Sequence, residues 1–474
     1  MKLSLSSTGK AKIKGIEEIY DVTIYQNNEQ NVTSVYLSVE VLNSQKNKSS
    51  ATLIPSYIDE LEVEISNGAK LLLVGCGDRK HSTTVYASSR VEEFQYFADY
   101  IIYGASHVEN RFATAIYDIP GIIKWGTKTN FARSTQDEEK RYVDINTDTE
   151  IILYESQSYQ INYYVSRNYP LDFIKETVEL KQTPHIEIES LEGVESIQWF
   201  EKKLKEFVSV VELATHKKIN YKKISLLKIR RNEINTSENV VYDVDSYLAS
   251  NEFLEEEYHN NYLFNCVELV NNADLVTWNK KLSKLQPVLD LYREAYYAKY
   301  SNMQNHFLNI CQALETYHAR MVTNSKREYI RLANLKIEGY VSGWKDFLIR
   351  DEKKEHILLV ERISDLMFTD EPKYFFSGGF NFNEFPQKVS KTRNYYTHYN
   401  EKQKDTAFQG EDLITATRLL RLLLEFHLLK ELGFKNEDNF KKLMEHFKGV
   451  RTSMMYKEAL EKSDEINFEQ KNID

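Results

Sequence analysis

Two side chains that could act together on a phosphodiester, Arg393 and His398, lie five positions apart in the tyrosine-rich stretch RNYYTHYN. Histidine titrates near neutral pH and can serve as a base or an acid. Arginine keeps its charge and offers paired donors to a phosphate. Cleavage of RNA by its own 2′-hydroxyl needs both functions, because protons move while negative charge builds up on phosphorus. DNA lacks this hydroxyl, so the pair predicts chemistry on RNA.

The segment that carries the pair, FPQKVSKTRNYYTHYN, predicts a helix that begins after Pro386, because no helix breaker follows this proline. On such a helix Asn394 and His398 lie about 40° apart around the axis and one turn apart, so they share a face. Arg393 lies about 140° from His398, and only its long side chain lets the guanidinium reach the same phosphate. Asn394 therefore joins the candidate catalytic residues. The spacing by itself arises by chance in many proteins of this length.

The sequence lacks the signatures of other catalytic sites. It contains no HExxH, no paired CxxC, no GxxxxGK[ST] loop and no GxSxG elbow. The string HIEIES (His185–Ser190) looks like a set of metal ligands. Strand alternation places its two glutamates on one face, which we expect to lie in solvent. We expect neither a metal site nor a cofactor.

Length and composition predict a soluble protein of two domains or more. The 474 residues exceed one ordinary core, and 42% hydrophobic residues are ample for packed cores. Cys76, Cys266 and Cys311 lie too far apart for a disulfide framework, which suits a reducing cytosol. No signal-peptide core and no run of 18 apolar residues is present, so we expect a cytoplasmic protein without membrane contact. The net charge of −10 argues against nucleic-acid binding over the whole surface, but a local basic groove remains open.

The first 190 residues predict strands. Segments such as TSVYLSVEVL (33–42) and SYQINYYV (158–165) alternate with a period near two, which indicates antiparallel sheets in a sandwich or barrel-like body. An amphipathic helix follows at about 194–215. The lysine-rich segment 217–232 then predicts a strand pair. Its cations either protect a sheet edge against pairing with other molecules or bind the phosphates along a nucleic acid, and both interpretations stay open.

From about residue 250 the hydrophobic period changes to 3.6, which predicts consecutive helices. They cover about 278–300, 302–322, 326–337, 352–368 and 410–433, and the last has an acidic first turn and ends at Gly433. The sequence therefore predicts an α+β protein. A β-rich domain occupies residues 1–255 and an all-α bundle occupies residues 256–474.

The helical region resembles the ApeA-like branch of the HEPN ribonucleases (HEPN, the higher-eukaryote and prokaryote nucleotide-binding domain), which occurs in single-protein antiphage systems. Arg393, Asn394 and His398 match the family motif R-x4–6-H with a polar residue after the arginine. FLNICQALETYHAR (307–320) is similar to the first long helix of that branch. FADYIIYGASHVENRF (97–112) and GIIKW (121–125) resemble the ApeA N-terminal domain more loosely.

The resemblance implies a metal-independent endoribonuclease in antiphage defence that stops infection by cutting RNA, an outcome known as abortive infection. It also implies a homodimer, or a higher homo-oligomer, in which two HEPN bundles combine their motifs into one composite cleft. There His398 is expected to act as general base or acid and Arg393 to stabilise the phosphorane. Asn394 is expected to orient the phosphate or the histidine. Glu315 is expected to point toward the cleft and either hold Arg393 or remain a solvated helix residue.

Three further residues are assigned supporting or RNA-binding roles. His318, three residues after Glu315, either supports the site or is a partly buried structural histidine. Tyr396 is expected to stack on an unstacked base, and Lys391 to contact the RNA through its charge. Transfer RNA is one candidate substrate. The N-terminal domain is expected to gate the activity in response to a phage-derived trigger. The alternative is a non-catalytic HEPN module that dimerises or binds a nucleotide or partner, with a vestigial motif.

Overall fold

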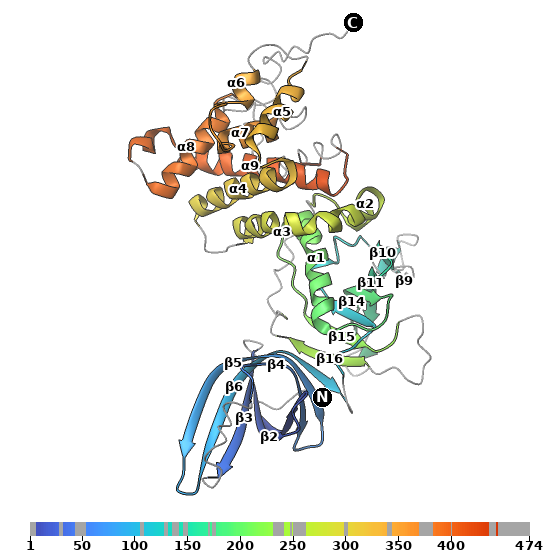
Figure 1. Cartoon of the computed structure of the whole chain (residues 1–474). Helices are drawn as coiled ribbons and strands as arrows, with labels where there is room; N and C mark the ends of the chain where they lie inside the picture. Colours follow the sequence, from blue (N-terminus) through green and yellow to red (C-terminus); the bar gives the residue numbers. More distant parts are fainter. Residues whose placement is uncertain are drawn as a thin grey trace. The chain divides into compact units, whose positions relative to one another are not determined.

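The structure is a computed structural model. It describes residues 6–27, 32–42, 54–104, 109–127, 131–134, 142–145, 150–168, 171–172, 177–230, 241–246, 249, 262–297, 302–338, 344–368, 383–399, 401–435 and 442–443. The N-terminal part is built mainly of antiparallel strands and the C-terminal part of helices (Figure 1). This confirms the predicted α+β class.

The contacts divide the chain into two compact units. The first comprises Met1–Val208 and Ile219–His259, and the second comprises Ser209–Lys218 and Asn260–Asp474. A domain boundary between residues 255 and 256 remains our proposal. The two compact units differ from this boundary mainly because Ser209–Lys218, which includes the end of the first long helix, belongs to the helical unit.

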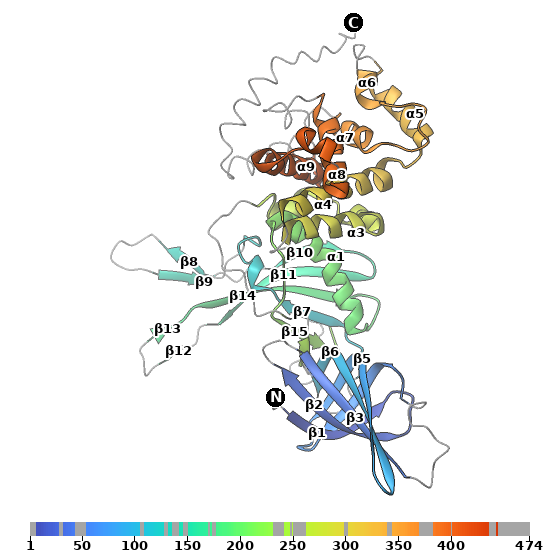
Figure 2. The same ribbon diagram turned by 90° about the vertical axis from the view of Figure 1, so that its left-hand side faces the viewer.

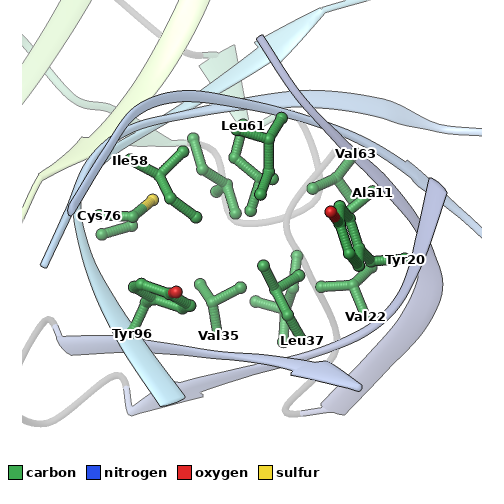
Figure 3. Close-up of a cluster of buried hydrophobic side chains, with 14 of the residues drawn as sticks. Ala11, Tyr20, Val22, Val35, Leu37, Ile58, Leu61, Val63, Cys76 and Tyr96 are labelled. Atoms are coloured by element: carbon green, nitrogen blue, oxygen red, sulfur yellow. The ribbon is translucent and has the colours of Figure 1, made fainter. Parts of the chain in front are cut away.

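Six antiparallel strands close into a barrel in the first unit. The order around the barrel is β6-β3-β2-β1-β4-β5, and β5 pairs again with β6. Alternate side chains point inward, so that Ala11 and Ile13 of β1 are buried while Lys10 is exposed. Figure 3 shows Leu37 and Tyr96 among the side chains that fill the barrel. The strands are β1 (Ser6–Ile13), β2 (Ile19–Asn27), β3 (Val32–Leu42), β4 (Tyr57–Ile65), β5 (Lys70–Val85) and β6 (Ser89–Gly104).

A second antiparallel sheet continues from the barrel. Residues 100–102 of β6 pair with β16, and the order then runs β16-β15-β7-β14-β11-β10. The helix α1 (Ile197–Thr215) lies along this sheet (Figure 2), and the ring of Trp199 is edge-on to Tyr159 of β11 at 5.7 Å. The strands are β7 (Thr114–Asp118), β10 (Ile151–Glu155), β11 (Tyr159–Asn168), β14 (Lys181–Ser190), β15 (Lys223–Leu227) and β16 (Val241–Ser246). Two small hairpins pair β8 (Phe131–Ser134) with β9 (Tyr142–Ile145), and β12 (Leu171–Asp172) with β13 (Thr177–Val178).

Two expectations about this unit are wrong. The described part of segment 217–232 holds one strand, β15, which lies between β7 and β16 and is therefore not a sheet edge. There Lys223 pairs with Asp243 at 2.7 Å, so its charge is matched across the strands. The glutamates of HIEIES share a face but are not in solvent, since Glu187 is 1% and Glu189 is 7% exposed. Sheet alternation predicts the shared face, whereas the groups that cover that face come from elsewhere in the chain.

The second unit is a helical bundle around α9, which is buried on most of its surface. The helix α4 packs against α3, α8 and α9, and α8 packs against α7 (Figure 1). The helices are α2 (Cys266–Asn272), α3 (Leu275–Tyr297), α4 (Met303–Tyr317), α5 (Lys326–Lys336), α6 (Trp344–Leu348), α7 (Leu359–Met367), α8 (Phe385–His398) and α9 (Gly410–Glu431). A π-helical turn, His318–Val322, follows α4. Short 3-10 turns occupy Glu401–Thr406 here and Pro120–Ile122 in the first unit.

The helix predicted at 352–368 is shorter in the structure, where α7 begins at Leu359. The carboxylate of Glu361 accepts the backbone N–H of Leu358 at 2.9 Å and that of Arg350 at 3.0 Å. These bonds satisfy free N–H groups at the helix start and hold the preceding charged stretch in a turn. The charged residues before Leu358 therefore precede the helix instead of forming its first turns.

Candidate active site

The helix α4 positions Glu315. Its N-cap is Asn302, whose side chain accepts the backbone N–H of Asn305 at 2.9 Å. Its buried stripe recurs at steps of three and four and includes Phe307, Ile310 and Leu314. Glu315 follows this stripe at the edge of the buried face and remains half-exposed.

The helix α8 positions the candidate catalytic residues. Pro386 lies in its first turn, where a missing N–H costs no hydrogen bond. Thr392 and Tyr396 belong to its buried stripe, and the Thr392 hydroxyl accepts a backbone N–H from the loop after the helix at 2.9 Å. Arg393 and Asn394 are therefore turned toward the partly exposed side of the helix.

Arg393 lies between one residue of its own helix and one of α4. Its Nη2 is 3.9 Å from Oε2 of Glu315, and its Nη1 donates to Oδ1 of Asn394 at 3.4 Å. The two charged side chains are 40% and 36% exposed. Both contacts are long, and an ion pair so open to water is weak. The two contacts thus hold the guanidinium in position, while it remains accessible to a phosphate.

His398 is the last residue of α8 and is exposed. It lies one turn after Asn394, the spacing that puts both residues on one helix face. Within the part of the chain that the structure describes, its imidazole makes no hydrogen bond or ion pair. The next residue, Tyr399, adopts the left-handed conformation (φ 48°, ψ 42°), which bulky residues seldom take, and it ends the helix.

His318 is completely buried. Its Nδ1 lies 3.0 Å from Nη1 of Arg362, and its Nε2 lies 3.1 Å from Oδ2 of Asp365. Because a guanidinium can only donate, Nδ1 accepts, and Nε2 therefore carries the hydrogen and donates to the carboxylate. Burial lowers the pKa of His318, and the carboxylate of Asp365 offsets this decrease only in part. The ring is thus a neutral bridge inside the bundle and is not exposed to substrate.

The two side chains assigned to RNA differ in exposure. Tyr396 is only 9% exposed, and its hydroxyl donates to the carbonyl of Phe408 at 2.9 Å. Its ring is committed to the core, where it lies edge-on to Phe307, so it cannot stack on a base in this conformation. Lys391 is exposed on α8. The tyrosine available next to His398 is Tyr399, which is 64% exposed.

Sequence reasoning missed a polar cluster on α7 beneath the site. Arg362 and Asp365 are 5% and 2% exposed, and both contact His318. Lys336 of α5 pairs with the second oxygen of Asp365 at 2.7 Å. The available signal is a pair of opposite charges three positions apart in an otherwise largely apolar helix. Such a pair also occurs on solvated helix faces, so it does not identify a buried network.

A single copy of the site can do only part of the chemistry. It offers one cation for the phosphorane, one amide and one exposed imidazole. Transfer from the 2′-hydroxyl needs a base, and the departing 5′-oxygen needs an acid. One imidazole cannot be deprotonated and protonated at the same moment.

Among the described residues, no group of three or more His, Cys, Asp or Glu side chains is arranged to hold a metal ion. No described helix combines the length and apolarity needed to cross a membrane. All three cysteines are free and buried.

Two family models match the chain. The model of the ApeA N-terminal domain 1 matches residues 6–278, and the model of the Apea-like HEPN domain matches residues 308–438. The second match makes the helical unit a domain of the HEPN class and contains Glu315, Arg393, Asn394 and His398. The first match covers more than half of the chain. The chain thus belongs to the ApeA family, which confirms the resemblance seen in the sequence. No curated protein and no solved structure was found to match.

Proposed function

We propose that the chain is a metal-independent endoribonuclease that acts in antiphage defence. The observation that carries this proposal is the half-exposed guanidinium of Arg393, set between Asn394 and Glu315. His398 lies one turn on from Asn394, at the exposed end of the same helix. HEPN domains are in general related to ribonucleases, and the match to the ApeA family supports a role in defence.

In the proposed reaction, the 2′-oxygen attacks the adjacent phosphorus while an imidazole takes its proton. The guanidinium of Arg393 stabilises the charge on the non-bridging oxygens of the phosphorane. The bond from phosphorus to the 5′-oxygen then breaks, and a protonated imidazole gives this oxygen a proton. The products are a 2′,3′-cyclic phosphate and a 5′-hydroxyl. Every charge and proton in this scheme is supplied by arginine and histidine, so no metal is needed.

The two histidines of the scheme come from two copies of the chain. HEPN domains typically dimerise and act on RNA, which supports a pair of bundles related by a two-fold axis. Each copy then contributes Arg393, Asn394 and His398 to one cleft. In one copy His398 is the base, and in the other it is the acid. An isolated monomer is therefore inactive.

The substrate is RNA with an unpaired, accessible stretch, because the 2′-hydroxyl must align with the phosphorus that it attacks. Lys391 supplies charge beside the site, and Tyr399 supplies an exposed ring. Transfer RNA, with its exposed loops, is the first substrate to test.

Such an activity must be restrained in a healthy cell. We assign this restraint to the N-terminal unit, acting in the cytoplasm and released by a phage-derived trigger. Three observations support the assignment: the separate compact β-rich unit, its match to the ApeA N-terminal domain, and three free cysteines that fit a reducing compartment.

The test compares wild type with Arg393→Ala and His398→Ala. Phage protection, growth toxicity and RNA breakage are measured in cells, and cleavage of total transfer RNA in EDTA is measured with purified protein. Both variants should lose protection and cleavage, and wild-type products should carry 2′,3′-cyclic phosphate ends. Gln387→Ala is the matched control, since it removes an exposed polar side chain from the first turn of the same helix and should keep both protection and cleavage. Cleavage and protection that survive in His398→Ala, or a strict need for Mg²⁺, would contradict the proposal.

A non-catalytic HEPN module is the second candidate. The observation that favours it is that His398 makes no hydrogen bond or ion pair with Arg393 or Glu315 within one copy, among the residues described. Such a module would dimerise or bind a nucleotide or partner, and would protect cells equally well with His398→Ala. The experiment above therefore separates the two functions.

A further inference from the structure

Arg362 is a buried cation whose direct hydrogen-bond partners among the described residues are all neutral. Its Nη1 donates to Nδ1 of His318 at 3.0 Å and to the carbonyl of Thr323 at 3.4 Å. Its Nη2 donates to Oδ1 of Asn324 at 2.7 Å. No carboxylate in the described part of the chain lies within 4 Å of the guanidinium. A buried charge that lacks an opposite charge is costly, so its compensation comes from farther away.

Glu315 contributes to this compensation through its charge, without a direct bond to Arg362 among the described residues. Burial lowers the pKa of Arg362, and the carboxylate of Glu315 is the strongest of the nearby negative groups that oppose the effect. The neighbouring Glu361 is already committed, because both of its oxygens lie 2.6 Å from Nζ of Lys326. Glu315 has a single, long ion pair within the described residues, to Arg393 at 3.9 Å. Its carboxylate therefore contacts the exposed Arg393 directly and acts on the buried Arg362 only through its charge at longer range.

The backbone ties the same groups together. The N–H of His318 donates to the carbonyl of Glu315, where α4 passes into the π-helical turn His318–Val322. Arg362 binds the side chain at the start of this turn and the carbonyl of Thr323 just after it. Turns of this kind often occur at functional sites. Arg362 thus fixes the end of the helix from which Glu315 projects.

We propose that Arg362 is a positioning residue: it holds Glu315, and through Glu315 it sets the orientation of the catalytic Arg393. This role rests on the proposed ribonuclease function. An open ion pair such as Glu315 with Arg393 is mobile on its own. The hydrogen bonds of Arg362 to His318 and Thr323 restrain the backbone from which this carboxylate projects. Arg362 itself does not touch the RNA.

The test is a double-mutant cycle with Arg362→Gln, Glu315→Gln and the combination, alongside wild type. Cleavage of total transfer RNA and of a fluorescent single-stranded oligoribonucleotide gives kcat and KM. Arg362→Gln should lower kcat about tenfold with KM nearly unchanged, because a misplaced cation loses transition-state stabilisation. In the Glu315→Gln background the same change should have less than about a twofold effect. Arg362→Lys, which keeps the charge, should recover most of the loss.

The matched control is Lys326→Met, which removes a second buried cation from the contact between α5 and α7. It should lower the Tm at least as much as Arg362→Gln, yet change kcat by less than about threefold. Equal losses of kcat from Arg362→Gln in both backgrounds would overturn the positioning role. So would a loss of kcat in Lys326→Met that matches that in Arg362→Gln.

The Tm values of the same four proteins test the coupling without any catalysis. The decrease caused by Arg362→Gln should shrink by about half or more when Glu315 is already Gln. Additive decreases would overturn the proposal even if no RNA is cut. A failed ribonuclease function shows instead as no difference in RNA breakage between wild type and His398→Ala. The two failures are therefore distinguishable.

Discussion

Tyr396 and Tyr399 lie edge to face at the end of α8, with ring centroids 6.4 Å apart, but only one of them belongs to the core. Tyr396 is 9% exposed and Tyr399 is 64% exposed. The helix ends between them, and the left-handed backbone at Tyr399 places this ring outside the buried stripe. This exposed ring comes directly after His398, which makes it available to a substrate at the proposed site.

Replacing Tyr399 by Ala should therefore weaken RNA binding with little effect on folding. Stacking of a base on an aromatic ring contributes about 1–3 kcal/mol, so KM should rise by about tenfold while kcat is nearly preserved. Tyr396→Phe is the matched control, because it keeps the ring and removes only the hydroxyl bond to Phe408. This control should lower the Tm slightly and leave KM unchanged. A KM that rises in the control but not in Tyr399→Ala would show that the exposed ring does not bind RNA.

Two cations two positions apart on α8 should have different effects on catalysis. Arg393→Ala should lower kcat by about 100- to 1000-fold, the range seen when one oxyanion-stabilising donor is removed. Lys391 is exposed and has no acidic partner among the described residues. Lys391→Ala should raise KM and reduce the salt dependence of binding, with kcat preserved. Steady-state kinetics at about 50 and 200 mM salt measure both effects. Equal losses of kcat in both variants would mean that the total positive charge of α8 determines kcat, and not the position of each cation.

The sequence predicted those parts of the site that depend on local pattern. The start of α8 near Pro386 and the shared face of Asn394 and His398 follow from periodicity and helix geometry alone. The separation of Tyr396 from Tyr399 does not, because it depends on where the helix ends. In RNYYTHYN no glycine or proline marks that end, and the left-handed Tyr399 takes the place of such a residue.

The parts that the sequence could not predict depend on contacts between distant segments. The pairing of β5 with β6 that closes the barrel is one example, and the central position of β15 in its sheet is another. The burial of Arg362 against His318 joins residues 44 positions apart. A charged residue within an apolar helix is usually solvated, so its burial becomes visible only when the neighbouring helices are in place.

His427 should make the helical unit sensitive to acid. It is 5% exposed on α9, and its Nε2 lies 3.0 Å from the carbonyl of Leu366, so the ring donates there as a neutral imidazole. Burial lowers its pKa to about 4. Between pH 6.5 and 4 the unfolded chain therefore binds a proton that the folded chain does not. Stability is complete above pH 6.5 and falls by about 3 kcal/mol as the pH drops to 4.

Hydrogen exchange followed by mass spectrometry on peptides of α9 measures this loss. His427→Gln keeps an N–H donor near the same position but does not titrate in this range. As the pH drops from 6.5 to 4, the free energy of opening should fall by about 3 kcal/mol less in His427→Gln than in wild type. The buried His318, whose pKa is also lowered, should reduce the stability at low pH in both proteins alike. Identical pH profiles for wild type and His427→Gln would rule out His427 as the source.

Glu201 should give the β-rich unit the opposite dependence on pH. It lies on α1 and is 3% exposed, and its carboxyl group is buried beside the side chain of Tyr221. Burial raises its pKa to about 7, an effect that Tyr221 and Lys205 offset only in part. Between pH 4.5 and 7 the folded chain holds a proton that the unfolded chain has lost. Stability is therefore complete below pH 4.5 and falls as the pH rises to 7, by about 3 kcal/mol in total.

Glu201→Gln should remove this penalty, because the amide stays neutral at every pH. Hydrogen exchange in peptides of α1 should show a gain of up to about 3 kcal/mol at pH 8 and almost none at pH 4. Glu206→Gln is the matched control on the same helix, since Glu206 is partly exposed and paired with Lys203 at 2.9 Å. It should not produce a gain that grows with pH. An equal gain at both pH values in Glu201→Gln would assign the effect to packing, because only the ionisation of a buried carboxyl makes the gain appear as the pH rises.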